Sequence, residues 1–318
     1  MPWILGLKFL GLAVFAFLFF RSWSTVEAAA ESIASIPATA WGAAFLASLL
    51  SLLFAAFRTG ALLRAAGGHL PVRSLFADLA VATALNSLLI AGVEMVYRTE
   101  RVRPTVDSLA TASLVVVGDR LLGLMVMILA TVVLFFGLGP TDAVMNTTGL
   151  LLGTVALLPL VGGILLLPRL PERWRRGPER LFATARAMAR HPMALLSAGM
   201  NSIISFVFGI LIVVAVGHGI GIEVPLVTYF YMVPVVAMAT VLPVSIGGVG
   251  VREVGYVFFL GAAGAEAEGQ AVALGLAQYS VFLMTSVVGL GVLAQRHLFS
   301  KRHPSDKPPK APNTPNAP

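Results

Sequence analysis

The sequence contains no cysteine, which excludes disulfide bonds, thiolate metal sites and cysteine nucleophiles. Charged residues are also scarce: they make up 12% of the 318 residues, against about a quarter in a soluble domain. The chain has no Walker A sequence, so we do not expect ATP to drive it directly. Its five histidines show no metal-ligand spacing. These absences argue against a soluble catalytic domain, and we expect neither a metal nor a cofactor.

Apolar residues are abundant and make up 58% of the chain. Because a spanning helix needs about 20 apolar residues, the sequence predicts an all-α polytopic membrane protein with about eight hydrophobic elements. These elements cover residues 3–20, 38–57, 75–97, 111–136, 146–167, 193–217, 224–263 and 270–294. The first run could instead be a signal peptide cleaved near residues 26–30, but Lys8 lies inside it, so we favour a retained span.

The net charge is +7, from 22 Lys and Arg against 15 Asp and Glu. In a soluble protein this excess could indicate nucleic acid as a partner, but here the cations lie between apolar runs, where they set orientation and meet anionic headgroups. We therefore expect the basic segments and both termini on the cytoplasmic side of a bacterial inner membrane. The basic segments are 58–73, 98–103, 168–192 and the tail from 296; the acidic connections, predicted to face outward, carry Glu27, Glu31, Asp142, Glu223, Glu266 and Glu268.

The charge pattern predicts six full spans and two re-entrant or broken helical hairpins. Run 75–97 has basic flanks on both sides and should enter and leave from the cytoplasm, whereas run 224–263 has acidic flanks and should enter and leave from outside. Three crossings per half is an odd number, which predicts an inverted-topology repeat. Paired broken elements of this kind mark the binding site of a transporter. As an alternative, 224–243 is long enough at ~1.5 Å per residue to cross fully.

This reading divides the chain into a membrane domain at 1–297, with halves at about 1–137 and 138–297, and a disordered tail at 298–318. The tail is rich in proline and polar residues and lacks apolar periodicity, which is typical of disorder.

The first candidate site lies in the first hairpin and the span after it. Its candidate residues are Asn86, Glu94, Arg98, Asp119 and Arg120. Glu94 and Arg98 stand four residues apart, so we expect them to form an ion pair on one helix face, with Arg98 meeting a lipid phosphate. Asp119 and Arg120 point about 100° apart on a helix, so each needs its own partner, because a charge within a span costs at least ~2.5–3.5 kcal/mol. Structural ion pairing is the alternative reading of these charges.

The second candidate site is the glycine-rich break "LPVSIGGVGVREVGY" at 242–256. Its candidate residues are Pro243, Ser245, Gly247, Gly248, Gly250, Arg252 and Glu253. Glycines let backbone N–H groups converge at the start of the following helix, and such an end binds anions. Arg252 would add a full positive charge that Glu253 holds. The alternative is a tight interhelical turn with a stabilising first-turn glutamate.

These motifs resemble a known family. The run P-x-S-I-G-G-x-G-x-R-E at 243–253, the element at 86–98 and "DRLLGL" at 119–124 are similar to the flippase-like membrane domain of lysylphosphatidylglycerol synthases, over about residues 5–295. The first hairpin departs from the family pattern, because Val93 separates Gly92 from Glu94 and Arg98 follows Glu94 by four positions instead of three. The soluble aminoacyl-transferring domain is not seen, so the resemblance implies translocation without synthase chemistry.

Together these observations predict a flippase-like transporter, not an enzyme, that moves an anionic phospholipid or a polyprenyl-linked lipid between leaflets. Membrane lipids are then its partners. Two alternatives stay open: an intramembrane enzyme that modifies a lipid head group, and a non-transporting partner of a lipid-synthesis enzyme.

Overall fold

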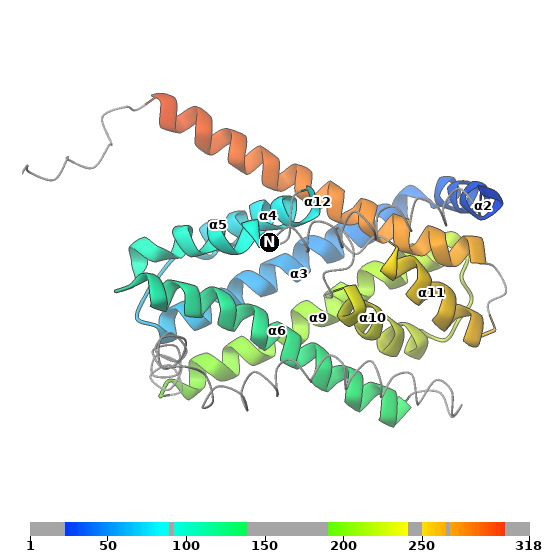
Figure 1. Cartoon of the computed structure of the whole chain (residues 1–318), viewed down its shortest axis with the longest axis horizontal. Helices are drawn as coiled ribbons and strands as arrows, with labels where there is room; N and C mark the ends of the chain where they lie inside the picture. The colour runs from blue at the N-terminus through cyan, green and yellow to red at the C-terminus, as the bar shows by residue number, and fades with distance from the viewer. Residues whose placement is uncertain (1–22, 89–91, 139–189, 241–249, 265–267, 303–318) are drawn as a thin grey trace, which may run out of the picture.

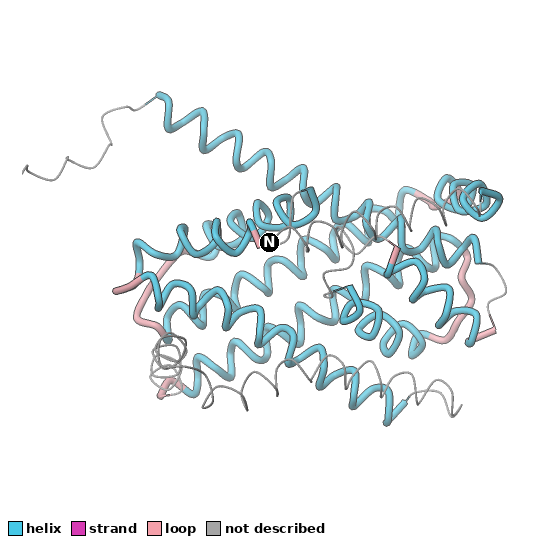
Figure 2. The backbone as a smooth tube through the Cα atoms, viewed as in Figure 1, coloured by secondary structure: helices cyan, strands magenta, loops and turns pink. Residues whose placement is uncertain are grey.

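The computed structural model describes residues 23–88, 92–138, 190–240, 250–264 and 268–302. Within these ranges the chain forms nine α-helices and one 3-10 turn (Figure 2). The predicted spans 3–20 and 146–167 lie outside the described residues, as do most of the basic segment 168–192 and the tail beyond 302.

Within the described residues, four helices are long and apolar enough to cross a membrane. They are α3 (Ala38–Ala65), α6 (Leu109–Leu138), α9 (Pro192–Ile220) and α12 (Glu268–Arg302). Even α3, with 28 residues, extends ~42 Å at ~1.5 Å per residue, more than the ~30 Å hydrocarbon core of a bilayer. These helices confirm four of the predicted apolar runs, and the protein is an all-helical polytopic membrane protein.

Two pairs of shorter helices lie between the long ones. The first pair is α4 (Val72–Leu88) and α5 (Val93–Val102), and the second is α10 (Leu226–Thr240) and α11 (Val251–Ala262). At ~1.5 Å per residue they extend only ~15–26 Å, less than the ~30 Å core. Both α5 and α11 begin after a glycine with positive φ, Gly92 at 104° and Gly250 at 89°. Each of these two short helices therefore begins at a backbone conformation that favours glycine.

The neighbours of each helix follow a regular scheme. Helix α3 packs against α9, α6 packs against the first short helix of the second pair, α10, and α12 packs against α4. The scheme is symmetric between the halves. If each of α3, α4, α5 and α6 is exchanged in order with its counterpart among α9, α10, α11 and α12, the same pairs of helices are in contact. Figure 1 shows the α4–α5 pair beside the left part of the long helices and the α10–α11 pair beside the right part.

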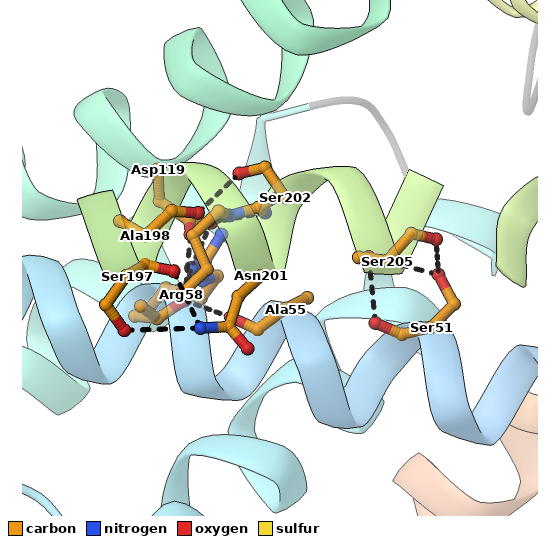
Figure 3. Close-up of polar contacts among 11 residues, drawn as sticks. Ser51, Ala55, Arg58, Asp119, Ser197, Ala198, Asn201, Ser202 and Ser205 are labelled. Carbon is orange, nitrogen blue, oxygen red and sulfur yellow. Dashed lines mark hydrogen bonds and ion pairs between the residues drawn. The ribbon is translucent and has the colours of Figure 1, made fainter. Parts of the chain in front are cut away.

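A reciprocal contact joins α3 and α9 at their centre. The Ser51 hydroxyl donates to the Ser205 carbonyl at 2.9 Å, and the Ser205 hydroxyl donates to the Ser51 carbonyl at 2.9 Å (Figure 3). Ser205 follows Ser51 by 154 residues. The same spacing separates the starts of α3 and α9, at 38 and 192, and of α4 and α10, at 72 and 226. The two halves thus share one register over two consecutive helices.

Helix α2 (Trp23–Ala34) precedes the first long helix and was not among the predicted elements. It packs against the start of α12, where a Cβ added to Gly269 would lie 2.8 Å from the Cβ of Ala28. The residues 26–30, considered above as a cleavage region, lie within this helix.

Apolar side chains fill the spaces between the helices. The largest cluster joins α9, α10, α11 and α12 and includes the buried residues Val213, Tyr229, Met232, Tyr256, Phe259 and Leu274. A smaller cluster lies between the ends of α3 and α5 and the starts of α6 and α9, with Leu63, Val102, Val115, Val116 and Ala198. Both clusters lie next to the short helices that carry the candidate site residues.

Candidate functional site

Asp119 on α6 is the centre of a buried ion network, with 1% of its side chain exposed. Arg58 on α3 donates to it from Nε at 2.6 Å and from Nη2 at 3.1 Å. Arg98 on α5 donates from Nη2 at 2.8 Å, and the hydroxyl of Thr59 donates at 2.9 Å. Figure 3 shows Arg58 and Asp119 between α3 and its neighbours, beside the α9 residues Asn201 and Ser202. One carboxylate therefore connects three helices.

A glycine makes room for this arrangement. Gly123 lies one turn after Asp119 on α6, and a Cβ added there would lie 3.1 Å from Nη1 of Arg58. The Arg58 guanidinium thus lies directly on the surface of α6. The prediction that Arg58 lies in a basic connection is wrong, because α3 continues to Ala65 and includes this residue. Its position within a still apolar helical run was the signal that could have identified it.

Glu94 and Arg120 form a second ion pair between α5 and α6. The other oxygen of Glu94 accepts the N–H of Gly92 at 2.9 Å, at the start of α5. The predicted pair between Glu94 and Arg98 is therefore wrong: both α5 side chains turn toward α6, where Asp119 and Arg120 offer opposite charges. The expectation that Asp119 and Arg120 each have a separate partner is confirmed. Arg98, predicted in a basic connection, is buried within α5.

The second candidate site begins at Gly250, whose N–H donates to Oε2 of Glu253 at 2.6 Å. The other oxygen, Oε1, is buried without a hydrogen-bond partner among the residues that the structure describes. It lies against Gly275 on α12, where an added Cβ would be 2.8 Å from Oε1. Glu253 therefore stabilises the first turn of α11, as the alternative reading expected, and its second oxygen is packed against the backbone of α12.

Arg252 is buried beside Glu253 and faces aromatic rings of α12. Its guanidinium carbon lies 5.4 Å from the ring centre of Phe282 and 6.0 Å from that of Tyr279. Cations at such distances over ring faces are attracted by the ring quadrupole. The ring of Tyr279 also connects the two short-helix pairs, because its hydroxyl donates to the carbonyl of Ser87, near the end of α4, at 2.8 Å.

The remaining predicted site residues are less closely connected. Asn86 is exposed in the last turns of α4. Pro243, Ser245, Gly247 and Gly248 lie outside the described residues, so the convergence of backbone N–H groups at this break stays a prediction. In the described ranges, no three His, Asp or Glu side chains gather closely enough to hold a metal ion.

A comparison with known protein families matches residues 3–289 to the lysylphosphatidylglycerol synthase TM region. The chain belongs to this family. The match includes both short-helix pairs and all four long helices except the last turns of α12. Searches of curated proteins and of solved structures each gave no match. Membership of the lysylphosphatidylglycerol synthase TM family associates the chain with flippase-like lipid translocation, and so with a role in handling lipid.

Proposed function

We propose that the protein moves an anionic phospholipid or a lipid-linked anion between the leaflets of the membrane. The observation that carries this proposal is the shared carboxylate of Asp119, on the candidate span α6. It pairs with the buried Arg98 and with Arg58, whose side chain is only 13% exposed. A buried charge without a counter-charge costs several kcal/mol. The excess cation is therefore best explained by an anion that occupies the site during part of its cycle.

The arrangement of the two halves supports a transport function. Four long helices and two short pairs with exchangeable neighbours are expected of an inverted-topology repeat with six spans and two re-entrant hairpins. In such transporters the broken helices meet near the middle of the membrane and hold the substrate there. Tyr279, which contacts Ser87 of one pair and lies under Arg252 of the other, marks the place where we expect the headgroup to bind.

The carboxylates have a defined part in this proposal. In the empty state Asp119 and Glu94 hold arginines that would otherwise be buried or half-buried cations. When a lipid phosphate enters, it becomes the acceptor for Arg98 while Asp119 keeps its bonds to Arg58, so neither the arginine nor the carboxylate is left without a counter-charge. Because the phosphate makes bidentate bonds with guanidinium groups, the exchange needs little net free energy. An ion gradient or the lipid gradient would supply the driving force.

Leaflet-resolved lipid movement in proteoliposomes tests the proposal. The assay uses labelled phosphatidylglycerol and a labelled polyprenyl-phosphate lipid with wild type, Arg98→Gln and Arg252→Gln. We expect both variants to lose most of the movement. Arg98→Gln should still fold, because Asp119 keeps its two bonds to Arg58.

The matched control is Arg103→Gln, at an exposed position beyond α5 where the arginine pairs only loosely with Glu100 at 3.5 Å. It removes one positive charge without touching the buried network, so its transport should equal that of wild type. Equal movement in wild type, both site variants and empty vesicles would contradict transport. It would instead favour a head-group-modifying enzyme or a partner of a lipid-synthesis enzyme.

The membrane topology has its own test, which the absence of cysteine makes clean. Single cysteines at Arg73, in the first turn of α4, and at Arg103, after α5, should react with an impermeant thiol reagent from the same side of the membrane. A cysteine at Glu223, between α9 and α10, should react from the other side. Reaction of positions 73 and 103 from opposite sides would contradict the first re-entrant hairpin and the inverted repeat with it.

A further inference from the structure

A second ion cluster lies outside the network around Asp119. Asp78 on α4 accepts three bonds at Oδ1: from the Tyr97 hydroxyl at 3.2 Å, from Nε of Arg101 at 3.0 Å and from Nη1 of Arg296 at 2.5 Å. Nη1 of Arg296 also contacts the Tyr97 hydroxyl at 2.5 Å. Tyr97 and Arg101 come from α5 and Arg296 comes from α12. The cluster therefore joins the first short-helix pair to a long helix of the other half.

The exposure of these groups is uneven. The Asp78 side chain is only 6% exposed, whereas those of Arg101 and Arg296 are 41% and 31% exposed. The carboxylate is thus covered and the two guanidinium groups face outward. Each guanidinium has five N–H donors, and the bonds to Asp78 use one nitrogen of each. Two cations against one anion leave an excess positive charge at the surface of the cluster.

The position of the cluster indicates its surroundings. Arg101 lies in the last turn of α5, and Arg296 lies at the end of the candidate span Glu268–His297. The cluster is thus located where a span leaves the hydrocarbon core and meets the headgroups. Basic pockets between helices at this depth bind anionic headgroups, and tyrosines are enriched there.

We propose that Arg101 and Arg296, held in position by Asp78, form a binding site for the phosphate of an anionic phospholipid at the membrane surface. The site shares no residue with the network around Asp119, so it does not depend on the transport proposal. Because the two arginines come from α5 and α12, a bound phosphate would bridge the first short-helix pair and the other half of the molecule. The bound lipid would thereby stabilise the contact between the two halves.

The test is the thermal unfolding of the purified full-length protein in neutral detergent, titrated with dioctanoyl-phosphatidylglycerol. We expect a saturable rise in the unfolding midpoint that dioctanoyl-phosphatidylcholine does not produce. Arg296→Gln and Arg101→Gln should each weaken the apparent affinity about tenfold, the effect of losing one hydrogen bond to a charged group. Arg103→Gln, a neighbouring exposed arginine outside the cluster, should leave the affinity unchanged.

Two further arms separate this site from others. If the glutamine variants do not fold, Arg101→Lys and Arg296→Lys replace them. Lysine keeps the positive charge that Asp78 needs but lacks the planar guanidinium group that matches a phosphate. These variants should therefore bind phosphatidylglycerol several-fold more weakly than wild type. The substitution Arg98→Gln weakens only the proposed transport site. Titrating this variant with dioctanoyl-phosphatidylglycerol should therefore still raise its unfolding midpoint.

Three results would overturn the proposal. One is the absence of a saturable stabilisation in wild type. Another is a stabilisation that Arg98→Gln removes and Arg296→Gln keeps, which would place the lipid at the transport site. The third is an equal, saturable stabilisation by inorganic phosphate with the same dependence on Arg296, which would identify a site for a soluble anion.

Discussion

Helices α5 and α11 begin in the same way: each follows a glycine with positive φ, and in each a nearby glutamate accepts that glycine's N–H, Glu94 from Gly92 and Glu253 from Gly250. They differ in how they are joined to the next long helix. Arg98 of α5 donates to Asp119 of α6 at 2.8 Å, whereas the Tyr256 hydroxyl of α11 donates to Oε1 of Gln278 on α12 at 2.7 Å.

The two bonds lie at corresponding positions of the halves. Gly92 and Gly250 precede Arg98 and Tyr256 by six residues each, and the starts of α6 and α12 precede Asp119 and Gln278 by ten residues each. The third helix shows the same contrast, because α3 contributes Arg58 and Thr59 where α9, in the register of the serine pair, has Ile212 and Val213. A neutral bond thus holds one short pair where a charged network holds the other. Packing alone does not require the charges, which supports their assignment to an anionic substrate.

The largest expected effect on stability comes from removing the carboxylate at the centre of the charged network of the first half. Asp119→Asn leaves the buried Arg98 and the mostly covered Arg58 without their counter-charge, so it should lower the free energy of unfolding by about 3–5 kcal/mol. Chemical unfolding of the purified protein in detergent measures this loss. Glu94→Gln is the control: its partner Arg120 is 48% exposed, so the loss should be about 1 kcal/mol or less. Equal losses in the two variants would contradict a special role for the buried network.

The next effect concerns Glu253. In Gly275→Ala, the new Cβ would lie 2.8 Å from Oε1 and 3.0 Å from Cγ of Glu253, which should displace the side chain from the Gly250 N–H. Overpacking of this kind costs about 1–3 kcal/mol, and thermal unfolding should show the loss. Gly291→Ala, in the same helix but with no atom within 4 Å of the new Cβ, should be neutral. A neutral Gly275→Ala would show that Glu253 moves without cost.

A smaller effect on stability is expected from removing the neutral hydrogen bond between α11 and α12. Tyr256→Phe removes the donor to Gln278 and leaves a buried amide oxygen unsatisfied, at a cost of about 1–2 kcal/mol. Adding Gln278→Leu removes the orphaned group as well, so the double variant should recover most of the loss. A double-mutant cycle on unfolding free energies measures this. If the double variant were the least stable of the three, the bond would not be the simple neutral contact that the comparison assumes.

The smallest effect tests the axis between the halves. Ser51→Ala and Ser205→Ala each remove one side of a reciprocal contact, and side-chain hydrogen bonds between membrane helices contribute about 0.6 kcal/mol. Because the contact is symmetric, the two losses should be equal within error. Clearly different losses would show that the two serines are not equivalent and would weaken the repeat.

Much of the fold was accessible from local patterns. The four long helices followed from apolar runs, because lipid requires about 20 apolar residues per span and all backbone bonds satisfied within the helix. The glycine-rich sequence at 247–250 predicted the break before α11, whereas the charge pattern predicted a hairpin at 75–97 without placing its break at Gly92. Helix α2 and the extension of α3 past residue 57 did not, because polar residues within a helix, such as Arg58, end an apolar run without ending the helix.

Only the tertiary structure determines which charged side chains form ion pairs with one another. The sequence places Glu94, Arg98, Asp119 and Arg120 in one candidate site, but it predicts an ion pair between Glu94 and Arg98, because residues four apart are neighbours on a single helix. Arg58 reaches Asp119 across 61 residues of chain, over a surface that Gly123 leaves open. Composition and periodicity decide that a helix forms and that a buried charge needs a partner. Which opposite charge lies within 3 Å depends on how the helices pack, because the pairing is set by distance in space.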